Sequence, residues 1–272
     1  MPSILVIDSG VGGLSVCQSI MATSKADERP LQVIYFADDA FSPYGLLDEV
    51  ALEKRLESIV ASMLALHQPE LVVLACNTVS TLLLPYLRAQ FIDVPFVGVV
   101  PAIKPAAKHS ASKCIGLLAT PATVSRKYTD ELIADYASDC EVLRVGSTDL
   151  VMQAEALLAG KTLGLDVIQS TLAPFVALDG QAAVDTVVLG CTHFPLLKKQ
   201  LQTLLPEVTW IDSGEAIAKR VHDLLEHESI TAQNDCIHQI YFSKTLPDES
   251  IFKSALTQLG ILESELHLLK VL

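Results

Sequence analysis

Two cysteines occupy equivalent places in two similar segments of the chain. Residues 72–78 read VVLACNT and residues 187–193 read VVLGCTH, so Cys76 and Cys191 stand at the same position of the pattern. Each segment has the apolar run of a buried strand, one small residue, the cysteine, and two polar residues before a helix. A thiol in that position lies near the unpaired N–H groups and the positive dipole end of the helix, which favour a thiolate.

Two such thiols could invert an α-carbon, because inversion removes a proton from one face and delivers another to the opposite face. A free thiol has a pKa near ~8.5, so a modest shift lets one cysteine be thiolate while the other is thiol. A symmetric pair serves either direction of the reaction. The residues alone leave a second interpretation open, in which the pair packs as small hydrophobic side chains. We expect that structural role for the other cysteines, Cys17, Cys114, Cys140 and Cys236.

Two further features could carry chemistry. The turn from Asp8 to Ser15, DSGVGGLS, follows the first expected strand, and its glycines let backbone N–H groups approach an anion, although a tight turn that binds nothing has the same pattern. It matches neither the dinucleotide fingerprint nor the phosphate-binding loop. His193 could stabilise a thiolate at Cys191 or relay a proton, or it could be a structural hydrogen-bonding group. Zinc bound by Cys76, Cys191 and His193 matches no common ligand spacing, so we expect no metal.

Composition narrows the classes of partner. The formal net charge of −13 makes nucleic acid and anionic membranes unfavourable partners, and an anionic substrate would need local hydrogen-bond donors. No apolar run approaches the ~20 residues that span a bilayer, and no signal peptide pattern precedes the first strand. The scattered cysteines do not form a disulfide framework. We expect a soluble cytoplasmic protein.

Half of the 272 residues are hydrophobic, and short apolar runs alternate with helical patterns, which predicts an α/β fold with mainly parallel sheets. Helices are clearest before Pro69 and from Ser213. The two cysteine segments suggest two related lobes, and if the lobes face each other both thiols would enter one cleft. The expected strands are Ile4–Ile7, Val33–Phe36, Leu71–Ala75, Phe96–Val99, Ile115–Ala119, Glu141–Val145 and Thr186–Gly190.

Several segments together resemble the glutamate racemase family. The most specific are Ala75–Thr78 (ACNT) and Gly190–Leu197 (GCTHFPLL), in that order, after the turn that begins at Asp8. Pro43-Tyr44-Gly45, the segment Gly116–Thr120 with Thr123, and Ile211–Gly214 are also similar to family segments. The resemblance runs from the first strand to about residue 225.

The resemblance implies a fold, a reaction and a site. It implies two pseudo-symmetric three-layer lobes with the active site in the cleft between them, here residues 1–98 with 209–272, and residues 99–208. Cys76 and Cys191 would be the two bases that interconvert L-glutamate and D-glutamate without a cofactor, each deprotonating one enantiomer, with Asp8 and His193 assisting them. The implied role is the supply of D-glutamate for peptidoglycan, and the implied assembly is a homodimer. Substrate would be bound by Asp8, Ser9, Pro43, Tyr44, Gly45, Asn77, Thr78, Thr120, Thr192 and His193.

The sequence departs from the family near Tyr44. The family usually has Thr where Asp39 stands, Arg where Phe41 stands and a basic residue where Leu47 stands, so this loop is unusually apolar and acidic. The surroundings of Glu155 also differ, which puts its role in doubt. A related two-cysteine racemase acting on aspartate or hydantoins, and a non-catalytic binding protein on the same scaffold, are the alternatives. Retention of both cysteines with Asp8 and His193 favours catalysis.

Overall fold

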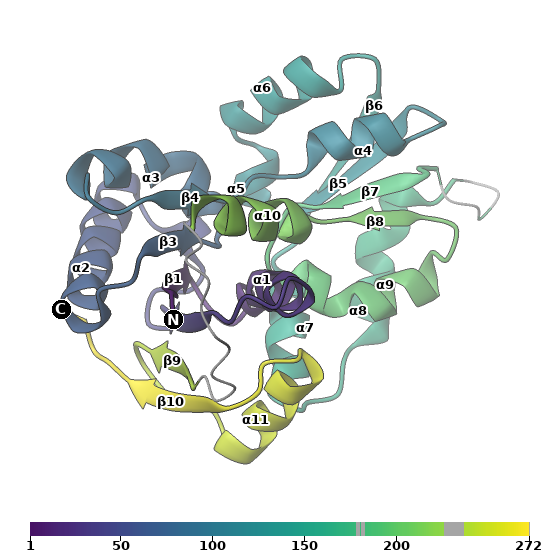
Figure 1. Cartoon of the computed structure of the whole chain (residues 1–272). Coiled ribbons are helices and arrows are strands. Elements are labelled where there is room, and N and C mark those ends of the chain that lie inside the picture. The colour runs from purple at the N-terminus through teal and green to yellow at the C-terminus, as the bar shows by residue number, and fades with distance from the viewer. Residues whose placement is uncertain (178–179, 181–182, 226–236, 272) are drawn as a thin grey trace. The chain divides into compact units, whose positions relative to one another are not determined.

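The computed structural model describes residues 1–177, 180, 183–225 and 237–271 (Figure 1). Strands and helices alternate along the chain, and the strands form two separate parallel sheets. The α/β class with parallel sheets in two sets is therefore confirmed. The chain forms two compact units, one of Met1–Val99, Leu158–Gly160 and Gly214–Leu272, and one of Val100–Leu157 and Lys161–Ser213.

The first unit contains a sheet of six strands in the order β10-β9-β2-β1-β3-β4, with every neighbouring pair parallel. From β1 the chain passes to β2 on one side and then to β3 on the other, so a topological switch point lies between β1 and β3. Ligands bind at such points in open parallel sheets. The strands are β1 (Ser3–Asp8), β2 (Gln32–Ala37), β3 (Leu71–Leu74), β4 (Phe96–Gly98), β9 (His238–Phe242) and β10 (Ser264–Leu268).

The second unit contains a sheet of four parallel strands in the order β6-β5-β7-β8. Its switch point lies between β5 and β7, by the same reasoning. The strands are β5 (Cys114–Ala119), β6 (Glu141–Gly146), β7 (Thr186–Leu189) and β8 (Thr209–Ile211).

Helices cover these sheets. The first unit has α1 (Leu14–Ala26), α2 (Glu49–His67), α3 (Asn77–Gln90), α10 (Gly214–Leu224), α11 (Glu249–Gln258) and the 3₁₀ turn η1 (Tyr44–Leu46). The second unit has α4 (Ile103–His109), α5 (Pro121–Val124), α6 (Lys127–Tyr136), α8 (Leu165–Leu172), α9 (Lys198–Leu204), and the 3₁₀ turns η2 (Ala173–Phe175) and η3 (Phe194–Leu197). Helix α7 (Asp149–Leu158) also belongs to it except for its last residue.

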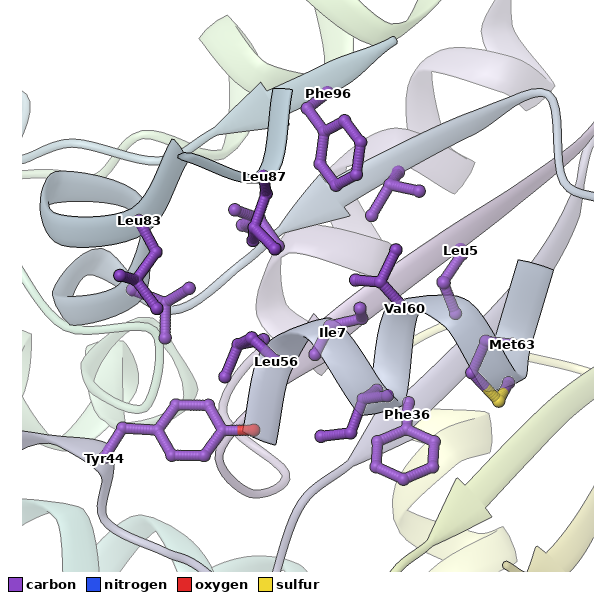
Figure 2. Packing of buried hydrophobic residues seen from close by; sticks show 14 of the residues in the cluster. Leu5, Ile7, Phe36, Tyr44, Leu56, Val60, Met63, Leu83, Leu87 and Phe96 are labelled. Atoms are coloured by element: carbon purple, nitrogen blue, oxygen red, sulfur yellow. The ribbon is translucent and has the colours of Figure 1, made fainter. Parts of the chain in front are cut away.

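Helix α2 shows how sequence pattern becomes core. Leu52, Leu56, Ile59, Val60 and Met63 lie on one stripe and are fully buried in one cluster with β1, β2 and β3 (Figure 2). Full burial of such a side chain contributes about 1.5–3 kcal/mol. The Asp48 carboxylate accepts a hydrogen bond from the N–H of Ala51 at the helix start, and Gln68 ends the helix in the left-handed conformation. This is the helix that the spacing before Pro69 predicts.

All seven expected strands are present, with ends that differ by at most one residue. Three strands, β8, β9 and β10, were not expected, because each is short and half-polar or lies late in the chain. The second compact unit extends to Ser213, because β8 pairs with β7 and the N–H of Thr209 donates to the carbonyl of Asp185. Cys236 lies outside the described residues. No helix of the described chain is long and apolar enough to cross a membrane.

A buried histidine joins β9 to β2. Nδ1 of His238 accepts the N–H of Val33 at 3.1 Å, and burial lowers the pKa of His238 below its ordinary 6.5. Since the depressed pKa favours the neutral ring, the stability that His238 contributes is complete above pH 6.5 and is lost as the pH falls through the folded-state pKa.

We therefore predict that His238→Leu costs about 1 kcal/mol of unfolding free energy at pH 8, the worth of a hydrogen bond whose donor stays buried. The difference between wild type and variant should shrink at pH 5, where the wild type must bind a proton at a buried ring. Urea denaturation of both proteins at the two pH values measures this. A difference that does not depend on pH would contradict the assignment.

Candidate functional site

Cys76 stands where β3 ends and α3 begins. The N–H of Ala75 donates to the carbonyl of Ile7 at 2.8 Å, which extends the β1–β3 pairing by one residue. Cys76 is the N-cap residue of α3, and its thiol is partly buried against the core of the first unit. The sequence prediction of a cysteine at a strand-to-helix turn is correct here.

Cys191 stands at the corresponding point of the second sheet. The N–H of Gly190 donates to the carbonyl of Leu118 at 2.8 Å, as Ala75 does to Ile7 in the first unit. Cys191 is 8% exposed and begins a turn that leads into η3 and then α9, so it does not cap an α-helix directly. By strand register, Cys76 and Cys191 are topologically equivalent.

The neighbours of the two cysteines are not equivalent. In register, Asp8 of the first unit corresponds to Ala119 of the second, because Ile7 and Leu118 hold matching places beside β3 and β7. His193, two residues after Cys191, corresponds to Thr78. Each unit therefore supplies one ionisable partner, a carboxylate on the strand beside Cys76 and an imidazole in the turn after Cys191.

Asp8 is fully buried at the end of β1. One of its carboxylate oxygens accepts the N–H of Gly13 at 2.6 Å, so the protein itself uses one of the N–H groups that the sequence suggested for an anion. A Cβ at Gly13 would lie 2.9 Å from Cβ of Asp8 and 3.0 Å from Cβ of Ala75, so only glycine fits there. The hydroxyl of Tyr35 donates to the carbonyl of Gly10 at 2.6 Å and fixes the rest of the turn.

His193 links Cys191 to Glu155. Its Nδ1 lies 3.8 Å from Sγ of Cys191, and its Nε2 lies 2.8 Å from Oε1 of Glu155, at the end of α7. Burial alone would lower the pKa of His193, but the hydrogen bonds to Cys191 and Glu155 outweigh it and raise the pKa well above 6.5. This geometry favours an imidazolium at His193, which places a positive charge beside Cys191. Glu155, whose role the sequence left in doubt, is thus in contact with His193.

The remaining residues of the predicted site fall near the ends of the same strands. Asn77 and Thr78 open α3 and are buried, and Thr192 is buried beside Cys191. Oδ1 of Asn77 has no hydrogen-bond partner within the described part of the chain. Thr120 caps α5, with its hydroxyl 3.0 Å from that of Thr123. Ser9 is buried in the turn after β1.

Tyr44, another residue of the predicted site, points its ring into the protein core. Its side chain is buried in the core of the first unit beside Leu56 (Figure 2), and its hydroxyl donates to Asp38 at 2.9 Å. Burial, followed by the charge of Asp38, raises the pKa of Tyr44 well above its ordinary value, so the phenol stays protonated. The part of this loop available to a ligand is therefore the backbone at Pro43, Tyr44 and Gly45. The buried Tyr44 ring holds the loop in place.

The three residues near Tyr44 at which the sequence departs from the family all contact other residues of the first unit. The Asp39 carboxylate accepts hydrogen bonds at 2.8–3.2 Å from the backbone and hydroxyls of residues 243–245, which follow β9. The Phe41 ring lies 4.4 Å beneath the guanidinium of Arg55. Leu47 packs against the core of the first unit. The apolar and acidic character of the loop is thus used internally.

The other described cysteines behave as the sequence predicts. Cys17 is fully buried, and desolvation raises the pKa of the Cys17, Cys114 and Cys140 thiols. Among the residues whose placement is described, no group of three or more His, Cys, Asp or Glu side chains is arranged to hold a metal ion.

Residues 4–221 match the model of the Asp/Glu/Hydantoin racemase family. The chain belongs to this family. The chain is 47% identical over 260 residues to the glutamate racemase of Vibrio cholerae, and the similarity covers 95% of this chain and 94% of that protein. Racemases are isomerases, and the chain is an enzyme of that class.

Solved structures agree with this assignment. The Escherichia coli glutamate racemase in complex with L-glutamate and an activator has a TM-score of 0.88 at 43% identity, covering 100% of this chain and 99% of that chain. The glutamate racemase of Aquifex pyrophilus has a TM-score of 0.70 at 28% identity, covering 98% of both chains.

Sequence reasoning missed Asp38 and Arg55, which bind each other within the first unit. Asp38 directly follows β2. In the sequence it is one of two adjacent acidic residues, Asp38 and Asp39, and nothing distinguishes the one from the other. Arg55 lies within the apolar stripe of α2. A helical-wheel projection of the sequence could therefore have indicated that its side chain is buried.

We predict that Glu155→Gln lowers the pKa of His193, because the variant loses the carboxylate at Nε2. NMR titration of the His193 ring protons measures the shift. Glu131→Gln is the matched control, since Glu131 is an exposed carboxylate of the same unit paired with Lys127. An unchanged His193 titration in the Glu155 variant would refute the proposed contact.

Proposed function

We propose that this racemase interconverts L-glutamate and D-glutamate by moving the α-proton between Cys76 and Cys191. The observation that carries the proposal is the equivalent placement of the two thiols at the ends of β3 and β7, each next to a strand switch point. Relatives named glutamate racemase, at up to 47% identity over nearly the whole chain, support glutamate as the substrate. The proposal requires both thiols to reach opposite faces of one α-carbon.

The two cysteines have ionisable partners of different chemistry. His193, held as an imidazolium by Glu155, places a positive charge beside Cys191. Asp8 places a buried negative charge on the strand beside Cys76, which favours the protonated thiol there. Cys191 then acts first as base and Cys76 as acid for one enantiomer. For the other enantiomer, Asp8 accepts the Cys76 proton and His193 returns one to Cys191.

Donors at helix starts bind the substrate carboxylates. The first N–H groups of α3, at Asn77 and Thr78, have no helical partner and carry the positive end of the helix dipole. Oδ1 of Asn77 is buried without a partner among the described residues, and it suits the α-ammonium group of the substrate. Ser9, Thr120 and Thr192 supply hydroxyls. Local donors of this kind bind an anion despite a net charge of −13.

The test incubates L-glutamate or D-glutamate with purified protein in D₂O without added cofactor. We expect loss of optical rotation with one solvent deuterium at the α-carbon. Cys76→Ala and Cys191→Ala should each slow racemisation by about 10²–10⁴-fold, the usual contribution of a general acid or base. Cys140→Ala, at a cysteine outside the proposed site, is the matched control and should keep wild-type turnover.

Two outcomes would reject this mechanism. A requirement for pyridoxal phosphate would remove the two-thiol reaction, and normal turnover in either alanine variant would remove that cysteine from it. Aspartate and a hydantoin are tested in parallel, because the family includes racemases of both. Absence of α-exchange with all three substrates would favour the non-catalytic alternative.

We further propose that the enzyme works in the cytoplasm as a homodimer and supplies D-glutamate for peptidoglycan. A bacterial strain that requires external D-glutamate should grow without it when it expresses this chain, and the Cys191→Ala variant should not support growth. Sedimentation velocity measures the assembly. A monomer at micromolar concentration would contradict the dimer, and lack of growth with a well-expressed active enzyme would contradict the cellular role.

A further inference from the structure

The first unit buries two carboxylates near the ends of neighbouring strands. Asp8 ends β1 and Asp38 directly follows β2, both are fully buried, and the backbone N–H of Asp38 donates to the carbonyl of Asp8 at 2.9 Å. Buried carboxylates are costly unless they are paired. Such a pair would also oppose an anionic ligand bound at this end of the sheet.

One buried cation, Arg55, compensates the negative charge of Asp38. Among the described residues, Arg55 is the one lysine or arginine that is buried, at 7% exposed. Its Nη2 lies 2.6 Å from Oδ1 of Asp38 and its Nε lies 3.0 Å from Oδ2, which is the two-pronged pairing that arginine makes with a carboxylate.

Other contacts fix the guanidinium. Its Nη1 donates to the carbonyl of Val271 near the end of the chain, and its flat face lies over the Phe41 ring at 4.4 Å. A lysine could not make the two-pronged pairing and the Val271 contact at once, because an ammonium is a point charge on a flexible stem. Arg55 is therefore held from three directions.

The Arg55–Asp38 pair in turn holds the Tyr44 loop. Oδ2 of Asp38 accepts both from Nε of Arg55 and from the hydroxyl of Tyr44 at 2.9 Å. The Tyr44 ring is buried, so this hydrogen bond ties the loop that carries Pro43 and Gly45 to α2. The ring of Phe41, at the start of the same loop, packs against the flat face of the Arg55 guanidinium.

We propose that Arg55 is a positioning residue for substrate binding, which neutralises Asp38 and through it fixes the Tyr44 loop. This inference rests on the proposed function, since it assigns the loop to glutamate binding. Arg55 contacts Asp38, Val271 and Phe41, away from the proton-transfer chemistry assigned to the two cysteines. Its loss should therefore weaken binding more than it slows proton transfer.

The experiment compares Arg55→Met, Asp38→Asn and the double variant, with Lys54→Met as the matched control. Lys54 is the exposed neighbour of Arg55 on α2. We expect Arg55→Met to raise KM for glutamate about tenfold with kcat changed less than about threefold, the signature of lost uniform binding. The double variant should recover a large part of this loss, because Asp38→Asn removes the carboxylate that Arg55→Met leaves unpaired. Lys54→Met should match wild type.

Thermal unfolding of the same proteins provides a readout that needs no activity. Arg55→Met should lower Tm, and the double variant should recover part of the loss. Recovery of neither KM nor Tm in the double variant would overturn the charge-compensation argument. A lowered kcat with unchanged KM in Arg55→Met would overturn the positioning role.

The two proposals fail separately. If the wild type exchanges the α-proton but Arg55→Met has wild-type KM, the inference on Arg55 fails while the function stands. If the wild type exchanges no α-proton, the proposed function fails, and glutamate binding by calorimetry replaces KM in the same set of variants.

Discussion

The register between neighbouring parallel strands is the constraint on which the candidate site depends. The bond from Ala75 to Ile7 in one sheet, and the bond from Gly190 to Leu118 in the other, fix the residue at which β3 and β7 stop. A slip of one residue in a strand turns every side chain to the opposite face. Both faces of β3 and β7 are buried, so such a slip would force every side chain to repack against the opposite face. The same forces that form the core therefore determine where Cys76 and Cys191 emerge.

The two units use the same strand arrangement and differ in charge. A carboxylate on β1 accompanies Cys76, whereas an imidazole in the turn after β7 accompanies Cys191, supported by Glu155. The strand scaffold is thus similar in the two units, whereas the ionisable groups beside the two cysteines differ. The proposed two-thiol reaction needs two similar bases, one of which holds the proton at the start. In that proposal, the different neighbours of Cys76 and Cys191 provide the difference.

The sequence predicts much of this arrangement because its strongest signals are local. Buried parallel strands appear as continuous apolar runs, so β1 to β7 could be located, and a cysteine after such a run identifies a sheet edge. β9 and β10 were missed because their residues are half-polar, and because β9 joins the sheet through pairing with β2 more than 200 residues away, while β10 pairs with β9. The contact of Glu155 with His193, and that of Arg55 with Asp38, also depend on tertiary packing. Residue type alone could not show that Arg55 turns inward from a helix stripe.

The order of strands in the first sheet has a consequence for synthesis of the chain. β2 has β1 on one side, but its other neighbour, β9, is synthesised only after the whole second unit. The second unit is almost continuous in the chain and pairs only with itself, so it can fold while the first sheet is still incomplete. Until residues 238–242 arrive, one side of β2 presents unpaired backbone groups, which is the hazard of any exposed strand edge. Completion of the first sheet is therefore a late event in the life of the nascent chain.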